Sequence, residues 1–201
     1  MTSKILVSKI LASIFALAIV ATAGPALAHT GPHAAPGMGF SFGAGLWHPL
    51  QGPDHLAQMV LVGLLAARAG GRAIWLLPLT FVAAMVAGAL IVRPEMAGTV
   101  IEWGILVGLA IAGVLAVSRD VVALPVMMAA VGAAGVLHGT AHGAEAPAAS
   151  FAVYVAGFVT ATSLLHAVGV VGGVWLMRQR AGALQVAGAA IAVAGVAGAI
   201  V

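Results

Sequence analysis

The sequence contains no cysteine and very little charge: only 6% of its 201 residues are Asp, Glu, Lys or Arg. The lack of cysteine excludes disulfides, thiolate metal ligands and cysteine nucleophiles. With so few charges the chain cannot cover a water-facing surface, and its 63% hydrophobic residues are typical of an integral membrane protein. The net charge of +3 comes from isolated residues rather than a basic patch, which argues against nucleic acid as a partner.

Lysine occurs only as Lys4 and Lys9, and both precede or open an apolar stretch, ILASIFALAIVATA. The stretch is followed by Ala26-Leu27-Ala28, the small-x-small pattern of a signal-peptide cleavage site. The alternative is an uncleaved additional helix. We predict three parts: a cleavable signal peptide over 1–28, a periplasmic N-terminal segment over 29–37, and a membrane domain over 38–201.

Six further apolar runs are each near or above the roughly 20 residues that a membrane-spanning helix needs. They cover approximately Met38–Ala67, Ala73–Val92, Gly98–Val117, Val121–Ala141, Ala149–Met177 and Gly182–Val201. Small residues at four-residue spacing, such as Gly104 and Gly108, allow helices to pack closely within a bilayer. The predicted fold is an all-α integral membrane protein, a six-helix transmembrane bundle that follows the signal peptide.

The arginines predict the orientation of this bundle. Cleavage of the signal leaves the mature N-terminus outside, so alternate connections face the cytoplasm. Those connections hold Arg68, Arg72, Arg119, Arg178 and Arg180, whereas Arg93 stands alone on the outside. This distribution agrees with the positive-inside rule, so we expect a multi-pass protein of the bacterial inner membrane with a periplasmic N-terminus and the lipid bilayer as a partner.

Polar residues at membrane depth are costly and therefore indicate function. The stretch HPLQGPDH places His48 and His55 two helical turns apart, with Asp54 beside them. Pro49 and Pro53 each remove a backbone donor, so the helix should kink or unwind here and free carbonyl groups. Freed carbonyls at this depth are tolerated where they line a polar cavity or an ion. The stretch therefore predicts a cation site.

A second polar stretch, LHGTAHGAE, ends the fourth expected helix on the outer side. His138 and His142 are four residues apart and share one helix face, and Glu145 continues that face by one turn. Two imidazoles at this spacing are close enough to bind one metal ion. Imidazole donors favour Ni²⁺, Co²⁺, Zn²⁺ or Cu²⁺, whereas Mg²⁺ and Ca²⁺ call for oxygen ligands.

Four other residues are weaker candidates for the metal site. Glu102, near the outer end of the third helix, and His166, inside the fifth, are in a position to complete or relay the site. His29 would begin the mature chain, where its α-amine and imidazole can chelate a metal with His33 nearby. For His166 alone an interhelical hydrogen bond is an equally good interpretation. Met59 and the pair Met127-Met128 are interpreted as packing residues.

Both polar stretches resemble the HupE/UreJ family of hydrogenase- and urease-associated nickel permeases. The family's marks are a His, five residues and Asp-His in the first mature helix, and an FHGxAHGxE-like stretch in the fourth. Both are present here as His48…Asp54-His55 and LHGTAHGAE, with Leu137 at the usual aromatic position. The resemblance implies transport of Ni²⁺ or Co²⁺ for metalloenzyme maturation. It also implies that His48, Asp54, His55, His138, His142 and Glu145 form the transport site.

The function predicted from the sequence is uptake of a divalent transition-metal ion by a secondary permease that is not an enzyme. No phosphate-binding loop motif is present, so coupling to ATP within this chain is not expected. The metal is cargo, and we expect no resident cofactor; the sequence identifies no soluble partner. Two alternatives remain open: an intramembrane zinc-dependent hydrolase and a metal sensor or scaffold that does not transport.

Overall fold

The computed structural model describes residues 42–91, 98–118, 120–146 and 148–199. The predicted signal peptide, the segment 29–37, His29, His33, Arg93 and Arg119 lie outside the described residues.

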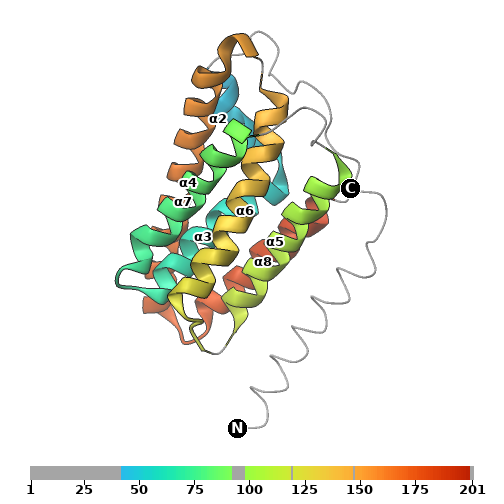
Figure 1. Cartoon of the computed structure of the whole chain (residues 1–201). Helices are drawn as coiled ribbons and strands as arrows, with labels where there is room; N and C mark the ends of the chain where they lie inside the picture. The colour runs from blue at the N-terminus through green and yellow to red at the C-terminus, as the bar shows by residue number, and fades with distance from the viewer. Residues whose placement is uncertain (1–41, 92–97, 119, 147, 200–201) are drawn as a thin grey trace.

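Every regular element within the described residues is a helix, as the sequence predicts. Figure 1 shows these helices side by side in one bundle. They are α2 (Phe42–Gln51), α3 (Pro53–Ala69), α4 (Ala73–Ile91), α5 (Thr99–Val117), α6 (Leu124–Glu145), the 3₁₀ turn η2 (Ala148–Ser150), α7 (Phe151–Gln179) and α8 (Ala183–Gly198).

The helix lengths confirm part of the predicted membrane topology. Helices α4, α5, α6 and α7 are long and apolar enough to cross a membrane, whereas α8 has 16 residues and falls short. The first expected span is divided at Gly52 into α2 and α3, which confirms that the helix is interrupted within HPLQGPDH. The fourth helix begins and ends later than expected, so that α6 carries all of LHGTAHGAE. Six spans therefore remain a prediction.

Close glycine contacts hold the helices together. A Cβ atom at Gly139 of α6 would overlap the backbone oxygen of Met85 in α4, so these two helices touch at the backbone. Gly63 of α3 lies equally close to the backbone of His166 in α7, and Gly45 of α2 to that of Tyr154, also in α7. Backbone contact of this kind increases van der Waals packing, which drives helix association where lipid supplies no hydrophobic force.

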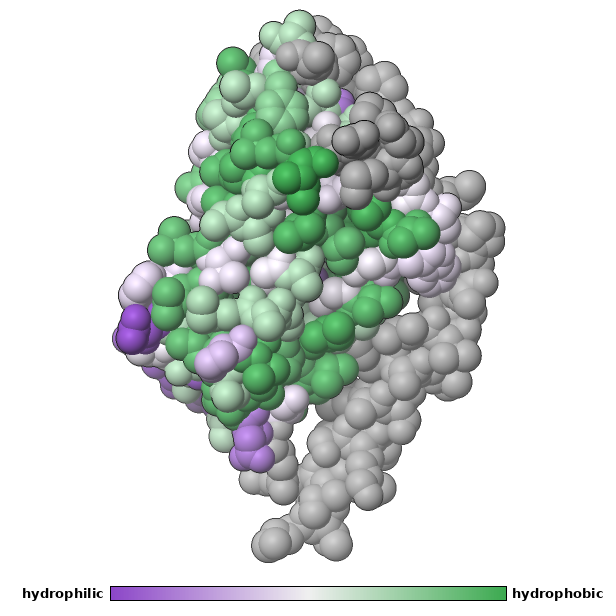
Figure 2. All heavy atoms as spheres, in the orientation of Figure 1, coloured by the Kyte–Doolittle hydropathy of each residue, from purple (hydrophilic) through white to green (hydrophobic). Residues whose placement is uncertain are grey.

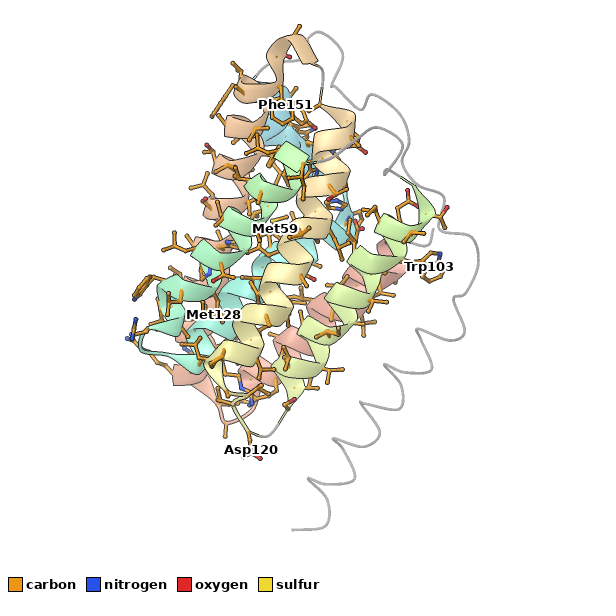
Figure 3. All side chains as sticks on the ribbon, in the orientation of Figure 1. Met59, Trp103, Asp120, Met128 and Phe151 are labelled. Atoms are coloured by element: carbon orange, nitrogen blue, oxygen red, sulfur yellow. The ribbon has the colours of Figure 1, made fainter. Side chains whose placement is uncertain are left out.

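The core between these helices is apolar. Met59, Leu77, Phe81 and Leu109 are fully buried, and Met59 lies among the helices whereas Trp103 points away from the bundle (Figure 3). Met59 and Met127 both belong to the hydrophobic core, which confirms their interpretation as packing residues. The face visible in Figure 2 is also largely apolar, and most of its strongly hydrophilic residues lie toward the lower end.

The lower end in Figure 1 is formed by the connections from α3 to α4, from α5 to α6 and from α7 to α8. Arg68 lies at this end and donates hydrogen bonds to the carbonyls of Leu115, Ala116 and Ser118, where α5 ends. These carbonyls have no partner within their own helix, so the guanidinium group caps α5. Arg72 lies 6.0 Å from the ring of Trp75, which is 49% exposed as an interfacial anchor would be.

Candidate metal centre

The first polar stretch is positioned by a break between two helices. Pro49 lies inside α2 without ending it, and the helix stops only at Gln51. Gly52 adopts an extended backbone, with φ of −91° and ψ of 114°, and Pro53 then opens α3. Proline suits the first position of a helix because its missing N–H would have had no helical partner there. The break therefore follows from Gly52-Pro53 rather than from Pro49.

The new helix begins with Asp54 and His55, which lie next to one another. The Nδ1 atom of His55 is 2.9 Å from Oδ1 of Asp54. A carboxylate can only accept, so Nδ1 must carry the proton and donate it, which leaves Nε2 of His55 with a free lone pair. Asp54 also lies in the first turn of α3, where a negative charge is stabilised by the helix dipole.

His138 is oriented in the same way by its own helix. Its Nδ1 atom donates a hydrogen bond of 2.8 Å to the carbonyl of Ala134, one turn earlier in α6. A carbonyl is an acceptor, so Nε2 of His138 also keeps its lone pair. Histidines that bind metals usually donate the other ring N–H to a carboxylate or a backbone carbonyl. Both His55 and His138 have this arrangement.

Four imidazoles from α2, α3 and α6 form one cluster. The ring centroid of His142 is 4.7 Å from that of His48 and 4.9 Å from that of His55. His55 in turn lies 4.9 Å from His138. The cluster therefore joins the two polar stretches that the sequence separates by 81 residues, 56 to 136.

Glu145 completes the cluster at the end of α6. Its Oε2 atom lies 2.9 Å from Nε2 of His48. Three possible metal-ligand atoms, one each from His48, His142 and Glu145, lie within 4.8 Å of one another. This is close enough for all three to bind one ion. No other group of three such side chains was found among the described residues. The arrangement offers nitrogen and oxygen ligands to a single divalent cation.

The cluster runs from the edge of the bundle into its core. The side chains of Glu145 and His48 are 39% and 20% exposed, whereas His138 and His142 are fully buried. Nε2 of His138 and both ring nitrogens of His142 have no hydrogen-bond partner. Leaving a buried donor or acceptor unsatisfied costs about 1–3 kcal/mol per group. Nitrogens left without protein partners are therefore available to a ligand.

Two of the weaker candidates lie elsewhere. His166 is buried in the middle of α7, and its ring packs on Phe81 rather than within the cluster. Glu102 is half-buried in the first turn of α5, and it is not part of the group formed by His48, His142 and Glu145.

Sequence reasoning missed the aromatic walls of the cluster. Tyr154 lies 5.9 Å from His48, and Phe158 lies 5.0 Å from His142, between ring centroids. Both come from α7 and are buried. Tyr154 is the chain's one tyrosine, and this rarity was a signal that could have drawn attention to it. Phe158 carries no comparable signal.

Comparisons with known proteins agree with the motifs. The model of the family described as HupE / UreJ protein matches residues 17–198. Protein HupE of Rhizobium leguminosarum bv. viciae is 38% identical over 193 residues, which cover 94% of this chain and 96% of that relative. No solved structure matches the chain. The match to the family model over most of the chain, together with this identity, confirms the resemblance that the two polar stretches predicted: the chain belongs to the HupE / UreJ protein family.

Proposed function

We propose that this protein is a secondary permease that takes up a divalent transition-metal ion, Ni²⁺ or Co²⁺, across the bacterial inner membrane for metalloenzyme maturation. The observation that supports it most is the set of donor atoms from His48, His142 and Glu145, which lie within 4.8 Å of one another. A polar cluster of this kind between apolar helices marks an ion pathway more often than a structural contact.

The ligand chemistry supports a borderline metal ion. Four imidazoles and the carboxylates of Asp54 and Glu145 form a donor set rich in nitrogen. Such a set suits Ni²⁺, Co²⁺, Zn²⁺ or Cu²⁺, whereas Mg²⁺ and Ca²⁺ prefer oxygen. We propose that the ion enters by Glu145 and His48, replaces their mutual hydrogen bond, and is then bound by His142, His55 and His138.

The orientation of the cluster in the membrane follows from the arginines. Arg68, Arg72 and Arg178 lie at one end of the bundle, and Glu145 ends α6 at the other. By the positive-inside rule the arginine end is cytoplasmic, so the cluster opens toward the periplasm. In this topology six segments cross the membrane, with α2 and α3 together forming the first, and the mature N-terminus is periplasmic. His29 and His33 are then placed to capture the ion first.

The membrane potential is sufficient to drive uptake. A potential of 100 mV, negative inside, favours inward movement of a divalent cation by about 4.6 kcal/mol, twice the value for one charge. The sequence offers no nucleotide-binding motif that would couple transport to ATP.

Reconstituted vesicles test this function. The purified protein is placed in lipid vesicles with an imposed inside-negative potential, and entry of ⁶³Ni²⁺, Co²⁺ and Zn²⁺ is followed. We expect Ni²⁺ or Co²⁺ to enter with the wild-type protein. Uptake should be lost with His55→Ala and with Glu145→Gln but retained with Asp120→Asn, which alters an exposed carboxylate at the arginine end. Wild-type vesicles no more permeable than protein-free ones would refute transport.

One observation favours a second candidate, an intramembrane zinc-dependent hydrolase. Two histidines and a glutamate, as in His48, His142 and Glu145, also make up a common catalytic zinc site, with Asp54 nearby as a base. A hydrolase would cleave a membrane-embedded substrate with bound Zn²⁺ and give no metal flux. A sensor or scaffold would show neither flux nor hydrolysis.

A further inference from the structure

Two further buried polar side chains lie nearer the arginine end of the helices than the cluster does. His166 is 1% exposed, and neither of its ring nitrogens has a hydrogen-bond partner. Gln58 is also 1% exposed, and its Oε1 atom has no partner. An interhelical hydrogen bond does not explain the burial of these two polar side chains, because neither residue makes one within the described part of the chain.

Helix α3, which carries Gln58, packs against α7, which carries His166. A Cβ atom at Gly63, five residues after Gln58 in α3, would overlap the backbone oxygen of His166 in α7. One turn before His166, the hydroxyl of Thr162 donates to Sδ of Met85 at 3.8 Å, which links α7 to α4. Unpartnered imidazole and amide groups thus occur on two helices whose backbones touch.

The ring of Phe81 packs against both the outer cluster and the imidazole of His166. Its centroid lies 5.3 Å from that of His138 and 5.1 Å from that of His166, with the rings edge-on in both contacts. His138 is the deepest histidine of α6, and His166 is the next imidazole inward. Phe81 thus contacts both the innermost histidine of the outer cluster and His166, and we expect an ion moving between them to pass its ring.

We infer that His166 and Gln58 form an inner binding site for a divalent transition-metal ion, distinct from the cluster of His48, His55, His138 and His142. This inference rests on the proposed function and extends it, since an ion on its way to the cytoplasm stops at two sites in turn. Imidazole nitrogen and amide oxygen suit the same borderline ions as the outer cluster.

The two sites differ in charge. The outer cluster contains the carboxylates of Asp54 and Glu145, whereas the inner site is formed by the imidazole of His166 and the neutral amide of Gln58. A site with fewer negative ligands holds a divalent cation less tightly, so the inner site suits release toward the cytoplasm while the outer one suits capture.

Cobalt binding to the purified protein tests the inner site without requiring transport. Equilibrium dialysis and the d–d absorption of Co²⁺ are measured for wild type, His166→Leu, Gln58→Leu and the control Ser163→Ala. Ser163 is exposed on the same helix, and its hydroxyl bonds only to the carbonyl of Val159. We expect two Co²⁺ per chain, with different affinities, for wild type and Ser163→Ala. His166→Leu should retain only the tighter ion, and Gln58→Leu should bind the weaker ion less strongly.

Vesicle uptake of ⁶³Ni²⁺ gives a second measurement. His166→Leu should lower the maximal rate by roughly 10–100-fold, the loss expected when a group supporting a metal site is removed, with the half-saturating concentration nearly unchanged. Both leucine variants should unfold at the wild-type temperature or above it, because each removes a buried polar group that has no partner.

A stoichiometry of one Co²⁺ in the wild type, or of two in His166→Leu, overturns the inner site. Unchanged maximal uptake in both leucine variants also overturns the inner site, but it does not contradict the outer site or the transport function. If wild-type vesicles take up no metal, the proposed function fails, and the cobalt stoichiometry still decides whether the inner site exists.

Discussion

At the scale of residues, the positions of protons on the histidines decide what the cluster can do. Asp54 accepts from Nδ1 of His55, and the carbonyl of Ala134 accepts from Nδ1 of His138, so both rings present Nε2. The sequence predicts which histidines occur together, but it cannot predict these orientations. They depend on a helix that starts at Pro53 and on a carbonyl one turn back in α6.

Asp54→Asn tests this orienting role. The amide side chain would keep the size of the carboxylate but lose the charge that holds Nδ1–H of His55 in place. We expect the affinity for Ni²⁺ to fall by roughly 10–100-fold, as is usual for a group that orients a metal ligand. Isothermal titration of the purified protein measures it, with Asp120→Asn as the matched control. Equal affinities in the two variants would remove Asp54 from the site.

At the scale of helices, the sequence predicted the apolar segments well and the break in the first one only approximately. Both prolines in HPLQGPDH were expected to disturb the helix, yet α2 passes through Pro49 and ends near Gly52. A proline inside a helix removes one hydrogen bond, here the one that the carbonyl of Gly45 would accept, and α2 packs closely on α7 at that residue. A proline after an extended glycine begins a new helix instead.

The candidate ligands come from two groups of helices that are packed at glycines. His48, Asp54 and His55 lie on α2 and α3, which contact α7, whereas His138, His142 and Glu145 lie on α6, which contacts α4. These contacts fix the distance between the backbones and hence the positions of the imidazoles. The periodic glycines were visible in the sequence, but their partners across the bundle were not.

Gly139→Ala tests the packing of α6 on α4. The new methyl group would overlap the carbonyl oxygen of Met85, so the helices must separate, at a cost of roughly 1–3 kcal/mol. We expect a lower unfolding temperature in detergent and weaker Ni²⁺ binding. Gly172→Ala is the matched control, because a Cβ atom there meets nothing within 4 Å. An unfolding temperature of Gly139→Ala equal to that of the wild type would contradict the close contact between α4 and α6.

At the scale of the whole molecule, composition predicted a membrane protein, the lengths of the apolar runs predicted helices, and two polar motifs predicted one site. Every regular element among the described residues is a helix, four of these helices are long and apolar enough to cross a membrane, and the two motifs lie together. The depth of each histidine could not be predicted from the sequence, because depth depends on how α6 and α7 pack. The rings of His138 in α6 and His166 in α7 both pack on Phe81.

The absence of cysteine makes the membrane orientation easy to measure. Single cysteines are introduced as Ala149→Cys, within η2, and as Ala181→Cys, between α7 and α8; both positions are exposed. A membrane-impermeant maleimide added to intact spheroplasts should label the first and not the second, because the arginine-rich end is cytoplasmic. Labelling of the second alone would reverse the orientation, place the cluster on the cytoplasmic side and contradict capture of the ion from the periplasm.

The central claim is that α2 and α6 jointly bind the transported ion. X-ray absorption at the nickel edge of the purified, Ni²⁺-loaded protein tests it most directly. We predict scattering from several imidazoles together with oxygen ligands, and the loss of one imidazole in each of His48→Ala and His142→Ala. Spectra identical to that of the wild type in either variant would contradict the shared site.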